Sequence, residues 1–429
     1  MKPMIMGSEH EYTLYSHQMN PRGIDPHRLA LEVLRKSQFA TQGEWLKNGS
    51  RAYFDVGHLE ISTPEVLDAY QLVVYEKAGE RIVDLARTKL EEFHNVKVSA
   101  FKNNTDPDGV SYGSHENYCV PRSIEFPGAY VRSLVPHLVS RLTFSGAGDF
   151  IDRRYVLSPC GYLTSELISG GNLSNTGILH TRDEPHADPT RWRRLHVIIG
   201  DALMSEWSIY LRAFTTSAIL QLMEKGLVDD APQLREPLRD MWHMVEQVAP
   251  EQWKLELVDG SWVSPMEIQR YYLAKVEEAG LVENAREKEA LSQWEWVLDR
   301  LDAGDLTKLK RKVEWMTRLI EVEKMIDLKG RDENVEIAAT KQYSELSLAS
   351  GLYYKLQAAG EVDRVVTDAE IKKAIVEPPP TRARARVKLL EEYEMGSIDW
   401  SEMSILTEDG GYERIHLPDP YDPKHEMVD

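Results

Sequence analysis

The sequence predicts an α+β protein built on a largely antiparallel sheet. Between Met4 and Val120, apolar residues often alternate with polar ones, as they do in strands that bury one face. Beyond Leu195, apolar residues recur instead at the spacing of amphipathic helices. A run of strands followed by a run of helices is typical of the α+β class.

The strand and helix spacings of the apolar residues predict the first elements of the chain. Met4–Ser16 is expected to form a strand and Pro26–Lys36 a short amphipathic helix. Arg51–Ser62 is expected to form a second strand. The apolar residues of Val66–Phe93 have helical spacing, whereas Val96–Ala100 alternates as a strand does. Helices should therefore cover one face of the sheet.

The next segments predict the direction of the strands and the position of the helices. Asn103–Gly109 is rich in turn residues and leads into a strand over Val110–Val120, which predicts a hairpin or near-hairpin. The sheet is therefore expected to be largely antiparallel. Helices are expected near Leu195–Glu224, Lys288–Asp302 and Leu306–Leu328.

Three consecutive prolines, Pro378–Pro380, mark the predicted domain boundary. Proline lacks a backbone N–H and disfavours the helical conformation of the residue before it, so a helix cannot continue through this segment. We expect a large catalytic domain over residues 1–377 and a small C-terminal domain over residues 378–429.

Composition excludes several classes of partner. The chain of 429 residues has 51 Lys+Arg and 70 Asp+Glu, a net charge of −19 that repels nucleic acid and anionic membranes. No run of about 18 apolar residues predicts a membrane span, and the first residues become acidic before a signal peptide could form. Cys119 and Cys160 are too few for a disulfide framework. We expect a soluble, cytoplasmic monomer.

Acidic side chains recur along the first two predicted strands. Glu9 and Glu11 are two residues apart, so both carboxylates should project from one face of the sheet. The second strand repeats this spacing, with Tyr53, Asp55, Glu60 and Glu65. Oxygen ligands gathered in this way suit Mg²⁺, which commonly bridges nucleotide phosphates. Spacing alone does not distinguish such a site from solvated edge-strand acids.

A basic segment precedes the expected helix near Leu195. It contains Arg182, His186, Arg193, Arg194 and His196. Arginines near a helix N-terminus can hold phosphate or carboxylate groups, but the segment also fits a charged loop with internal ion pairs. His115 and Asn117 alternate on the Val110–Val120 strand, and a lone histidine in a strand is usually structural. The densest basic run, Arg382, Arg384 and Arg386, is equally compatible with a solvated face.

Several ordered strings resemble the Pup ligase and depupylase family. The strings are MGSEHEY, NGSRAYFDVGHLEISTPE, EKAGERI, FKNNTDPDGVSYGSHENY, HTRDEPHAD and RRLHVIIGD, followed by weaker similarity at PPPTRARA and SIDW. The resemblance implies a curved, largely antiparallel sheet packed with helices, similar to glutamine synthetase and glutamate–cysteine ligase. It also implies ATP and Mg²⁺ as cofactors, a small acidic disordered Pup-like modifier, and lysine-bearing target proteins.

The same resemblance assigns roles to individual residues. It implies Glu9, Tyr53 and Glu60 as magnesium ligands and Asp55 as the catalytic aspartate. It implies ATP contacts from Arg51, Thr63 and Trp400, and Arg182, Arg193, Arg194 and His196 are expected to bind substrate.

Sequence features favour the ligase over the depupylase within this family. FDVG, FKNNTD and the short Tyr12–Asn48 connection resemble the ligase, whereas SHENY and GLYYKL are more similar to the depupylase. The predicted activity is ATP-dependent ligation of a terminal glutamate γ-carboxylate to a lysine. The alternatives are hydrolysis of a terminal glutamine amide or isopeptide bond, and a catalytically inactive nucleotide-binding regulator. Leu59 and Ile61 depart from the family's usual proline and tyrosine beside Glu60.

Overall fold

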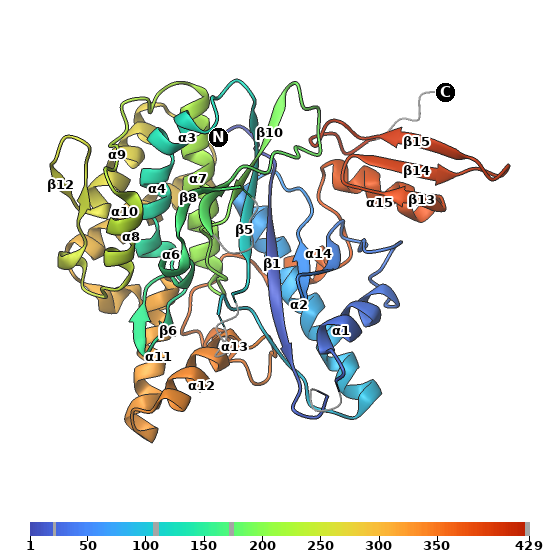
Figure 1. The fold of residues 1–429 in the computed structure, drawn as a ribbon, viewed down its shortest axis with the longest axis horizontal. Helices are drawn as coiled ribbons and strands as arrows, with labels where there is room; N and C mark the ends of the chain where they lie inside the picture. Colours follow the sequence, from blue (N-terminus) through green and yellow to red (C-terminus); the bar gives the residue numbers. More distant parts are fainter. Residues whose placement is uncertain (20–22, 106–110, 171–175, 425–429) are drawn as a thin grey trace.

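The computed structural model describes residues 1–19, 23–105, 111–170 and 176–424, and it confirms the α+β class (Figure 1). The central sheet has eight strands in the order β2-β3-β1-β5-β10-β9-β8, with β4 also paired to β1. Every pairing in it is antiparallel except β8 with β9. The strands are β1 (Met6–Tyr15), β2 (Arg51–Asp55), β3 (His58–Ser62), β4 (Ser99–Phe101), β5 (Ser114–Pro121), β8 (Glu166–Ser169), β9 (Gly177–His180) and β10 (Trp192–Val197).

The segment expected as one strand, Arg51–Ser62, is instead a hairpin of β2 and β3. Its two-residue turn consists of Val56 at φ 43° and Gly57 at φ 99°. Positive φ at both central positions is what a twisted two-residue hairpin turn requires. The alternation of side chains hid the turn, because polar and apolar residues continue to alternate on both sides of it.

The hairpin or near-hairpin expected between the Val96–Ala100 and Val110–Val120 strands is not formed. β4 and β5 do not pair with each other, because both pair with β1. A single bridge between Thr105 and Ser111 closes the connection. Residues 106–110 of the predicted turn lie outside the described part of the chain.

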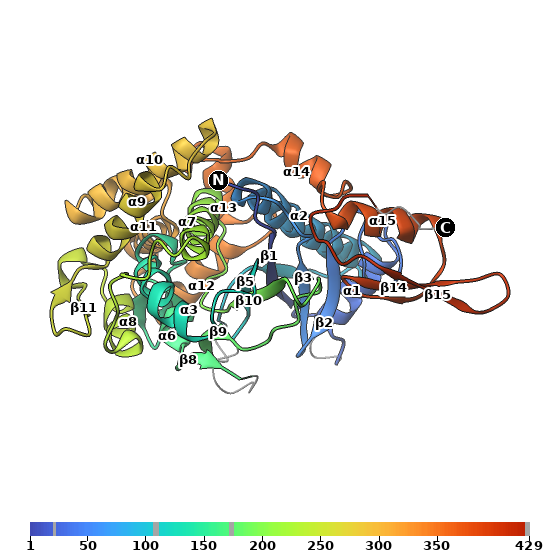
Figure 2. The same ribbon diagram turned by 90° about the horizontal axis from the view of Figure 1, so that it is seen from above.

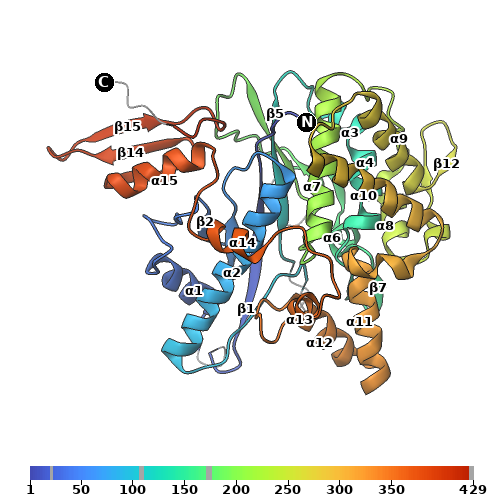
Figure 3. The same ribbon diagram turned by 180° about the vertical axis from the view of Figure 1, so that it is seen from behind.

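One short and one long helix lie on the rear face of the sheet, as seen from behind in Figure 3. α1 (Pro26–Arg35) begins at Asp25, whose side chain accepts a hydrogen bond from His27 N–H, and α2 (Ala69–His94) is capped in the same way by Asp68. α2 packs against α7 (Glu206–Glu224) and α14 (Asp368–Ala374). The predicted helix over Val66–Phe93 is thus confirmed with slightly later ends.

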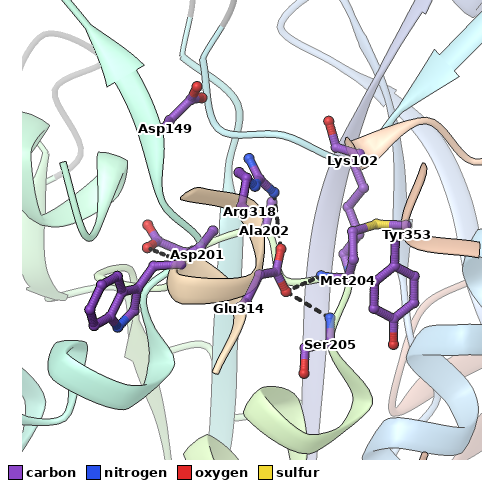
Figure 4. Close-up of polar contacts among 12 residues, drawn as sticks. Lys102, Asp149, Asp201, Ala202, Met204, Ser205, Glu314, Arg318 and Tyr353 are labelled. Carbon is purple, nitrogen blue, oxygen red and sulfur yellow. Dashed lines mark hydrogen bonds and ion pairs between the residues drawn. The ribbon is translucent and has the colours of Figure 1, made fainter. Parts of the chain in front are cut away.

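The helix expected over Leu195–Glu224 starts eleven residues late, at Glu206, because Leu195 belongs to β10. The intervening segment is extended and fixed by buried carboxylates (Figure 4). Glu314 accepts hydrogen bonds from the backbone N–H groups of Met204 and Ser205, each at 2.7 Å, and pairs with Arg318 at 3.0 Å. These tertiary contacts satisfy backbone groups that a helix would otherwise have satisfied internally.

The remaining helices form a second group beside the sheet (Figure 1). The helix predicted over Lys288–Asp302 is confirmed by α10 (Ala285–Asp302), whereas Leu306–Leu328 divides into η3 (Leu306–Arg311) and α11 (Glu314–Lys329). Among the described helices, none is long and apolar enough to cross a membrane. The other elements are α3 (Gly128–Ser133), α4 (Val135–Ser140), α5 (Leu142–Ser145), β6 (Asp149–Ile151), β7 (Arg154–Val156), α6 (Pro159–Leu163), α8 (Pro237–Val245), η2 (Pro250–Gln252), β11 (Leu255–Glu256), β12 (Trp262–Val263), α9 (Pro265–Glu278), α12 (Glu333–Ser344) and α13 (Leu352–Ala358).

A small C-terminal unit projects from one end of the molecule, beside α1 (Figure 2). It consists of α15 (Arg382–Glu392) and a three-stranded sheet of β13 (Met395–Ile398), β14 (Glu402–Leu406) and β15 (Tyr412–His416). Its apolar side chains form a separate cluster, to which the preceding body of the chain adds Trp45. We propose residues 378–429 as the C-terminal domain and residues 1–377 as the large domain, since the prolines directly precede α15.

A buried ion cluster attaches this unit to the sheet. Glu65, just after β3, accepts hydrogen bonds from Arg382 at 2.7 Å and Arg386 at 2.6 Å. Burial alone raises the pKa of Glu65, but the charges of Arg386 and Arg382 outweigh it and bring the pKa to about 2. Glu65 and two residues of the basic run are therefore structural, and only Arg384 of that run is exposed.

Glu65→Gln should loosen this attachment. The amide keeps the shape but cannot neutralise two buried guanidinium groups, so we expect a loss of about 3–5 kcal/mol in the free energy of unfolding near neutral pH. Because folding lowers the pKa from 4.5 to about 2, this stabilisation is present above pH 4.5 and is lost as the pH falls toward 2. Denaturant titrations across this pH range measure it. Arg384→Gln on the same helix is the matched control, and equal stability of Glu65→Gln and wild type at neutral pH would contradict the assignment.

Candidate active site

Alternation along β1 gives the sheet one polar face and one core face. Gly7, Glu9 and Glu11 lie on the polar face, whereas Ser8 and His10 point into the buried layer. The pairing register extends the polar face across neighbouring strands, since paired residues point to the same side. Glu9 pairs with Ser62 on β3 and with His115 on β5, and Glu11 pairs with Glu60.

Tyr53, Glu60 and Glu9 form an oxygen-rich group on this face. Tyr53 pairs with Glu60 across the hairpin and donates its hydroxyl hydrogen bond to the Glu60 carboxylate. Burial raises the pKa of Glu60 well above its usual range, and the charge of Glu9 raises it further. Burial also acts to raise the pKa of Glu9, but the hydrogen bond with His115 and the charge of His196 lower it overall. One ionised and one protonated carboxyl group therefore lie close together here. A divalent cation between them would allow both groups to ionise.

Asp55 ends β2 at the rim of the same face. It lies two residues beyond Tyr53 and pairs with His58 across the hairpin turn, where its side chain is exposed. Its negative charge is among the causes that raise the pKa of Glu60, which shows how near the two carboxylates are. An exposed carboxylate beside a buried oxygen-rich group is well placed to meet an incoming polar substrate.

Arg51 and Thr63 both lie at the open end of the β2–β3 hairpin, opposite its turn. Arg51 is held by Glu44, with Nε at 3.0 Å and Nη2 at 2.8 Å from one carboxylate oxygen, and its guanidinium lies 4.9 Å from the Tyr53 ring centre. Thr63 is buried, and its hydroxyl oxygen accepts a hydrogen bond from Ser8 N–H at 2.9 Å. Both side chains are thus fixed in place before any ligand binds.

A largely apolar pocket opens between the acidic face and the C-terminal unit. Trp400 bounds it, with its ring edge-on to Trp45 at 4.8 Å and against the Arg386 guanidinium at 4.9 Å. Glu9 and Thr63 form its opposite side. The pocket is also lined by Met6, Gly7, Cys119, Pro185, His186 and Pro420.

Gly7 is needed on the floor of this pocket. A Cβ atom at this position would lie 3.2 Å from the Thr63 hydroxyl oxygen, so any side chain would press on Thr63 and fill the space above it. Close approach of a ligand to the backbone is a common reason for glycine in a strand.

The structure separates the basic residues that the sequence grouped together. Arg193, Arg194 and His196 lie on β10 rather than before a helix, so Arg194 and His196 share the polar face and Arg193 points to the other one. Arg194 lies 3.5 Å from Glu9, whereas Arg193 pairs with Asp183 at 2.9 Å. Arg182 is exposed on the loop after β9 and is 3.8 Å from Glu184.

The site also includes residues that sequence reasoning did not assign. His115 and Asn117 are on the polar face of β5, and Asn117 donates a hydrogen bond to Glu9 at 3.1 Å. Their alternation was visible in the sequence, but their closeness to Glu9 depends on the β1–β5 register. His186, from the basic segment, and Arg382, from the basic run, also line the pocket. Both were visible in the sequence as basic clusters, but no local signal predicts that they meet.

Comparisons with known proteins identify the family. A family model described as "Pup-ligase protein" matches residues 4–404. The chain belongs to the Pup ligase family. A Pup–protein ligase of Acidimicrobium ferrooxidans is 34% identical over 99% of this chain and 97% of its own length. One from Paenarthrobacter aurescens is 33% identical over 100% and 98%.

Two solved structures of family members share the fold. The crystal structure of the complex between the prokaryotic ubiquitin-like protein Pup and its ligase PafA matches with a TM-score of 0.88 and 27% identity, over 99% of this chain and 90% of that one. The structure of the Pup ligase PafA in complex with ADP matches with a TM-score of 0.80 and 26% identity, over 93% and 90%.

The two departures from the family pattern beside Glu60 do not alter the polar face. Leu59 and Ile61 point to the opposite side of β3 and are fully buried in the cluster beneath the sheet. The substitutions therefore change the packing of the core layer and leave the oxygen-rich face as it is.

Glu60→Gln should weaken Mg²⁺-dependent nucleotide binding by about 10–100-fold, because the amide removes one negative oxygen from the group that also contains Glu9 and Tyr53. Calorimetric titration of ATP with Mg²⁺ and with chelator measures the effect. Glu295→Gln, an exposed change of the same kind on α10, is the control. Unchanged affinity in Glu60→Gln, or equal affinity in chelator, would refute the metal assignment.

Proposed function

We propose that this chain is an ATP-dependent ligase that joins the γ-carboxylate of a C-terminal glutamate, on a Pup-like modifier, to a lysine side chain of a target protein. One observation carries the proposal: an oxygen-rich face and a pocket for a planar base adjoin each other in a member of the Pup ligase family. The full-length relatives named as Pup–protein ligases favour ligation over the hydrolytic activity of a depupylase.

In this proposal the nucleotide base occupies the pocket bounded by Trp400, and Thr63 and Arg51 contact the nucleotide. The solved relative in complex with ADP supports nucleotide binding. Mg²⁺ would be held by Glu9, Tyr53 and Glu60, because these residues supply hard oxygen ligands. Burial and mutual repulsion keep the two carboxyl groups from ionising together when no cation is bound. The bound cation would supply neutralisation of the charge on the phosphate oxygens.

The reaction proceeds through an acyl phosphate. The modifier's γ-carboxylate oxygen attacks the γ-phosphorus of ATP, a P–O bond forms, and the bond to ADP breaks. The lysine amine then attacks the acyl carbon, a C–N bond forms, and phosphate leaves with the C–O bonding pair. Positioning and charge stabilisation account for most of the catalysis, because the chain itself forms no covalent bond to the substrate.

Asp55 is proposed as the general base for the second step. Its carboxylate would accept the proton that the attacking lysine amine loses. It is suited to this role because it is exposed at the rim, where a protein-borne lysine can reach it, and lies two residues from the proposed cation ligand Tyr53.

The modifier and the target enter from the solvent side of the polar face. Arg182 and Arg194 place guanidinium groups at this approach, 3.8 Å from Glu184 and 3.5 Å from Glu9 respectively. We propose that the local field of these groups, rather than the net charge of −19, steers an acidic disordered ligand. His196 adds a polar ring beside Arg194, whereas Arg193 would act only by fixing Asp183. We propose that the enzyme works as a cytoplasmic monomer on lysine-bearing proteins.

Asp55→Asn should abolish conjugation while preserving the fold and ATP binding. The amide is nearly isosteric but cannot accept the lysine proton, so a loss of about 10²–10⁴-fold in rate is expected. Conjugation of a Glu-ended modifier and amide hydrolysis of a Gln-ended modifier are assayed in parallel. Asp327→Asn, exposed on α11, is the control. Hydrolysis alone by wild type would favour the depupylase, neither activity would favour an inactive regulator, and full activity of Asp55→Asn would remove Asp55 from the mechanism.

Arg182→Gln should weaken modifier binding and reduce its salt dependence. Arg182 is exposed, so its effect should be largest at low ionic strength and should fade as salt screens it. Affinity for the modifier is measured at low and physiological ionic strength. Lys372→Gln on α14, which removes one exposed charge behind the sheet, is the control. Affinity that does not change with salt in the wild type would contradict electrostatic steering.

A further inference from the structure

A polar cavity of about 230 Å³ lies between β6 and the helices α11 and α12. It shares no lining residue with the pocket bounded by Trp400. Asp149 of β6 and Glu336 of α12 line the cavity, and both side chains are more than nine-tenths buried. Buried carboxylates are expensive unless a partner neutralises them, so this second cavity needs an explanation that the proposed reaction does not supply.

The buried charge around the cavity is predominantly negative. Arg318 of α11 pairs with Glu314 at 3.0 Å and also lies near Asp149, so one guanidinium group serves two carboxylates (Figure 4). Burial raises the pKa of Asp149, and the charge of Arg318 offsets this only in part. Of the other cations in the lining, Lys341 is half-buried and Arg153 is exposed. A further cation in the cavity would therefore favour the ionised form of Asp149.

Glu336 shows where a partner is missing. Its Oε1 accepts a hydrogen bond from Arg331 at 3.0 Å, whereas its buried Oε2 has no hydrogen-bond partner among the described residues. A buried carboxylate oxygen without a donor is unfavourable, and a charged donor is the partner that best satisfies it.

The lining favours an organic cation over a metal ion. No three ligand atoms of His, Cys, Asp or Glu converge here in the part of the chain that the structure describes, and the volume far exceeds that of a single ion. A primary ammonium group has three N–H donors, which suit the carboxylates and the hydroxyl groups of Thr340 and Ser344. Apolar side chains suited to an alkyl chain also line the cavity, namely Phe150, Ile151, Leu163 and Ile337.

We propose that this cavity binds a primary ammonium group carried on an alkyl chain, with Asp149 and Glu336 as its charge partners. Two sources share this chemistry. One is a free alkylamine, and the other is a lysine side chain of the target protein, in addition to the lysine that is conjugated. The second source rests on the proposed function, whereas binding of the ammonium group does not.

The cavity adjoins the end of the polar face that carries Asp55. Asp55 pairs with His58, whose Nδ1 lies 2.7 Å from Glu11. Thr13, two residues beyond Glu11, donates a hydrogen bond to Asn103 at 3.0 Å, and Asn103 lines the cavity. β2 and β4 are three strand spacings apart, about 14 Å, which an extended peptide covers in about four residues. A target lysine about four residues from the acceptor lysine therefore suits the cavity.

The test is calorimetric titration of the full chain with 1,4-diaminobutane in the absence of nucleotide. We expect wild type to bind the diamine. Affinity should fall about 10–100-fold in Glu336→Gln and in Asp149→Asn, because each variant removes one buried charge partner of the ammonium group. 1,4-Butanediol has the same chain length without charge and should not bind. The two variants are independent tests, since they change different elements, and thermal unfolding confirms that each is folded.

Glu323→Gln is the matched control. Glu323 pairs with Arg331 at 2.8 Å, as Glu336 does at 3.0 Å, but it does not line the cavity, so diamine affinity should persist in this variant. Absence of binding by wild type, unchanged affinity in both cavity variants, or equal binding of the diol would overturn the proposal.

Peptide substrates distinguish the two sources. If the target supplies the ammonium group, a peptide with a second lysine four residues from the acceptor should have a lower KM for conjugation than one with glutamine there, and Glu336→Gln should remove the difference. Equal KM values with diamine binding intact would identify a free alkylamine as the ligand. Diamine binding by a protein that neither ligates nor hydrolyses would refute the proposed function and leave the ammonium site standing.

Discussion

The buried ion network beneath β1 and β5 is the constraint on which the rest of the structure depends. His10 of β1 lies 3.0 Å from Glu76 of α2, and Glu116 of β5 lies 2.6 Å from Arg141. The network continues through Lys77, Glu80, Lys102 and Arg212. A one-residue shift in the register of either strand would leave buried charges without partners, and unpaired charges in the core are strongly destabilising.

This network determines which side chains reach solvent. Burial and the charge of Lys102 lower the pKa of His10 to about 4, so the ring is neutral near neutral pH, and its Nε2 lies 3.0 Å from the Glu76 carboxylate. With His10 fixed below the sheet, its neighbours Glu9 and Glu11 must project above it. The acidic face is therefore a direct consequence of the buried ion network on the other side of the sheet. The carboxylates lie close together despite their mutual repulsion, because the strand register leaves them no other position.

The C-terminal unit completes the site from a distant part of the chain. Glu65 lies just beyond Thr63, which follows the strand that carries Glu60, and it pairs with the first turns of α15. Arg382 also donates to the backbone carbonyl of His186, so the same residue holds the loop that lines the pocket. Trp400 packs on Trp45 and on Arg386. The pocket bounded by Trp400 thus depends on the same buried ion cluster that attaches the unit.

The sequence by itself determined the class of fold, the family and the acidic face. Side-chain period fixes which residues share a face within one strand, so Glu9 with Glu11 and Tyr53 with Asp55 could be paired without a structure. Only the tertiary structure decided which strands adjoin. The β2–β3 hairpin, the placement of His115 beside Glu9 and the separation of Arg193 from Arg194 all depend on it. The reason is physical: strand pairing and the late start of α7 are set by buried long-range partners such as Glu76 and Glu314. Local side-chain periodicity cannot predict contacts between residues so far apart in the chain.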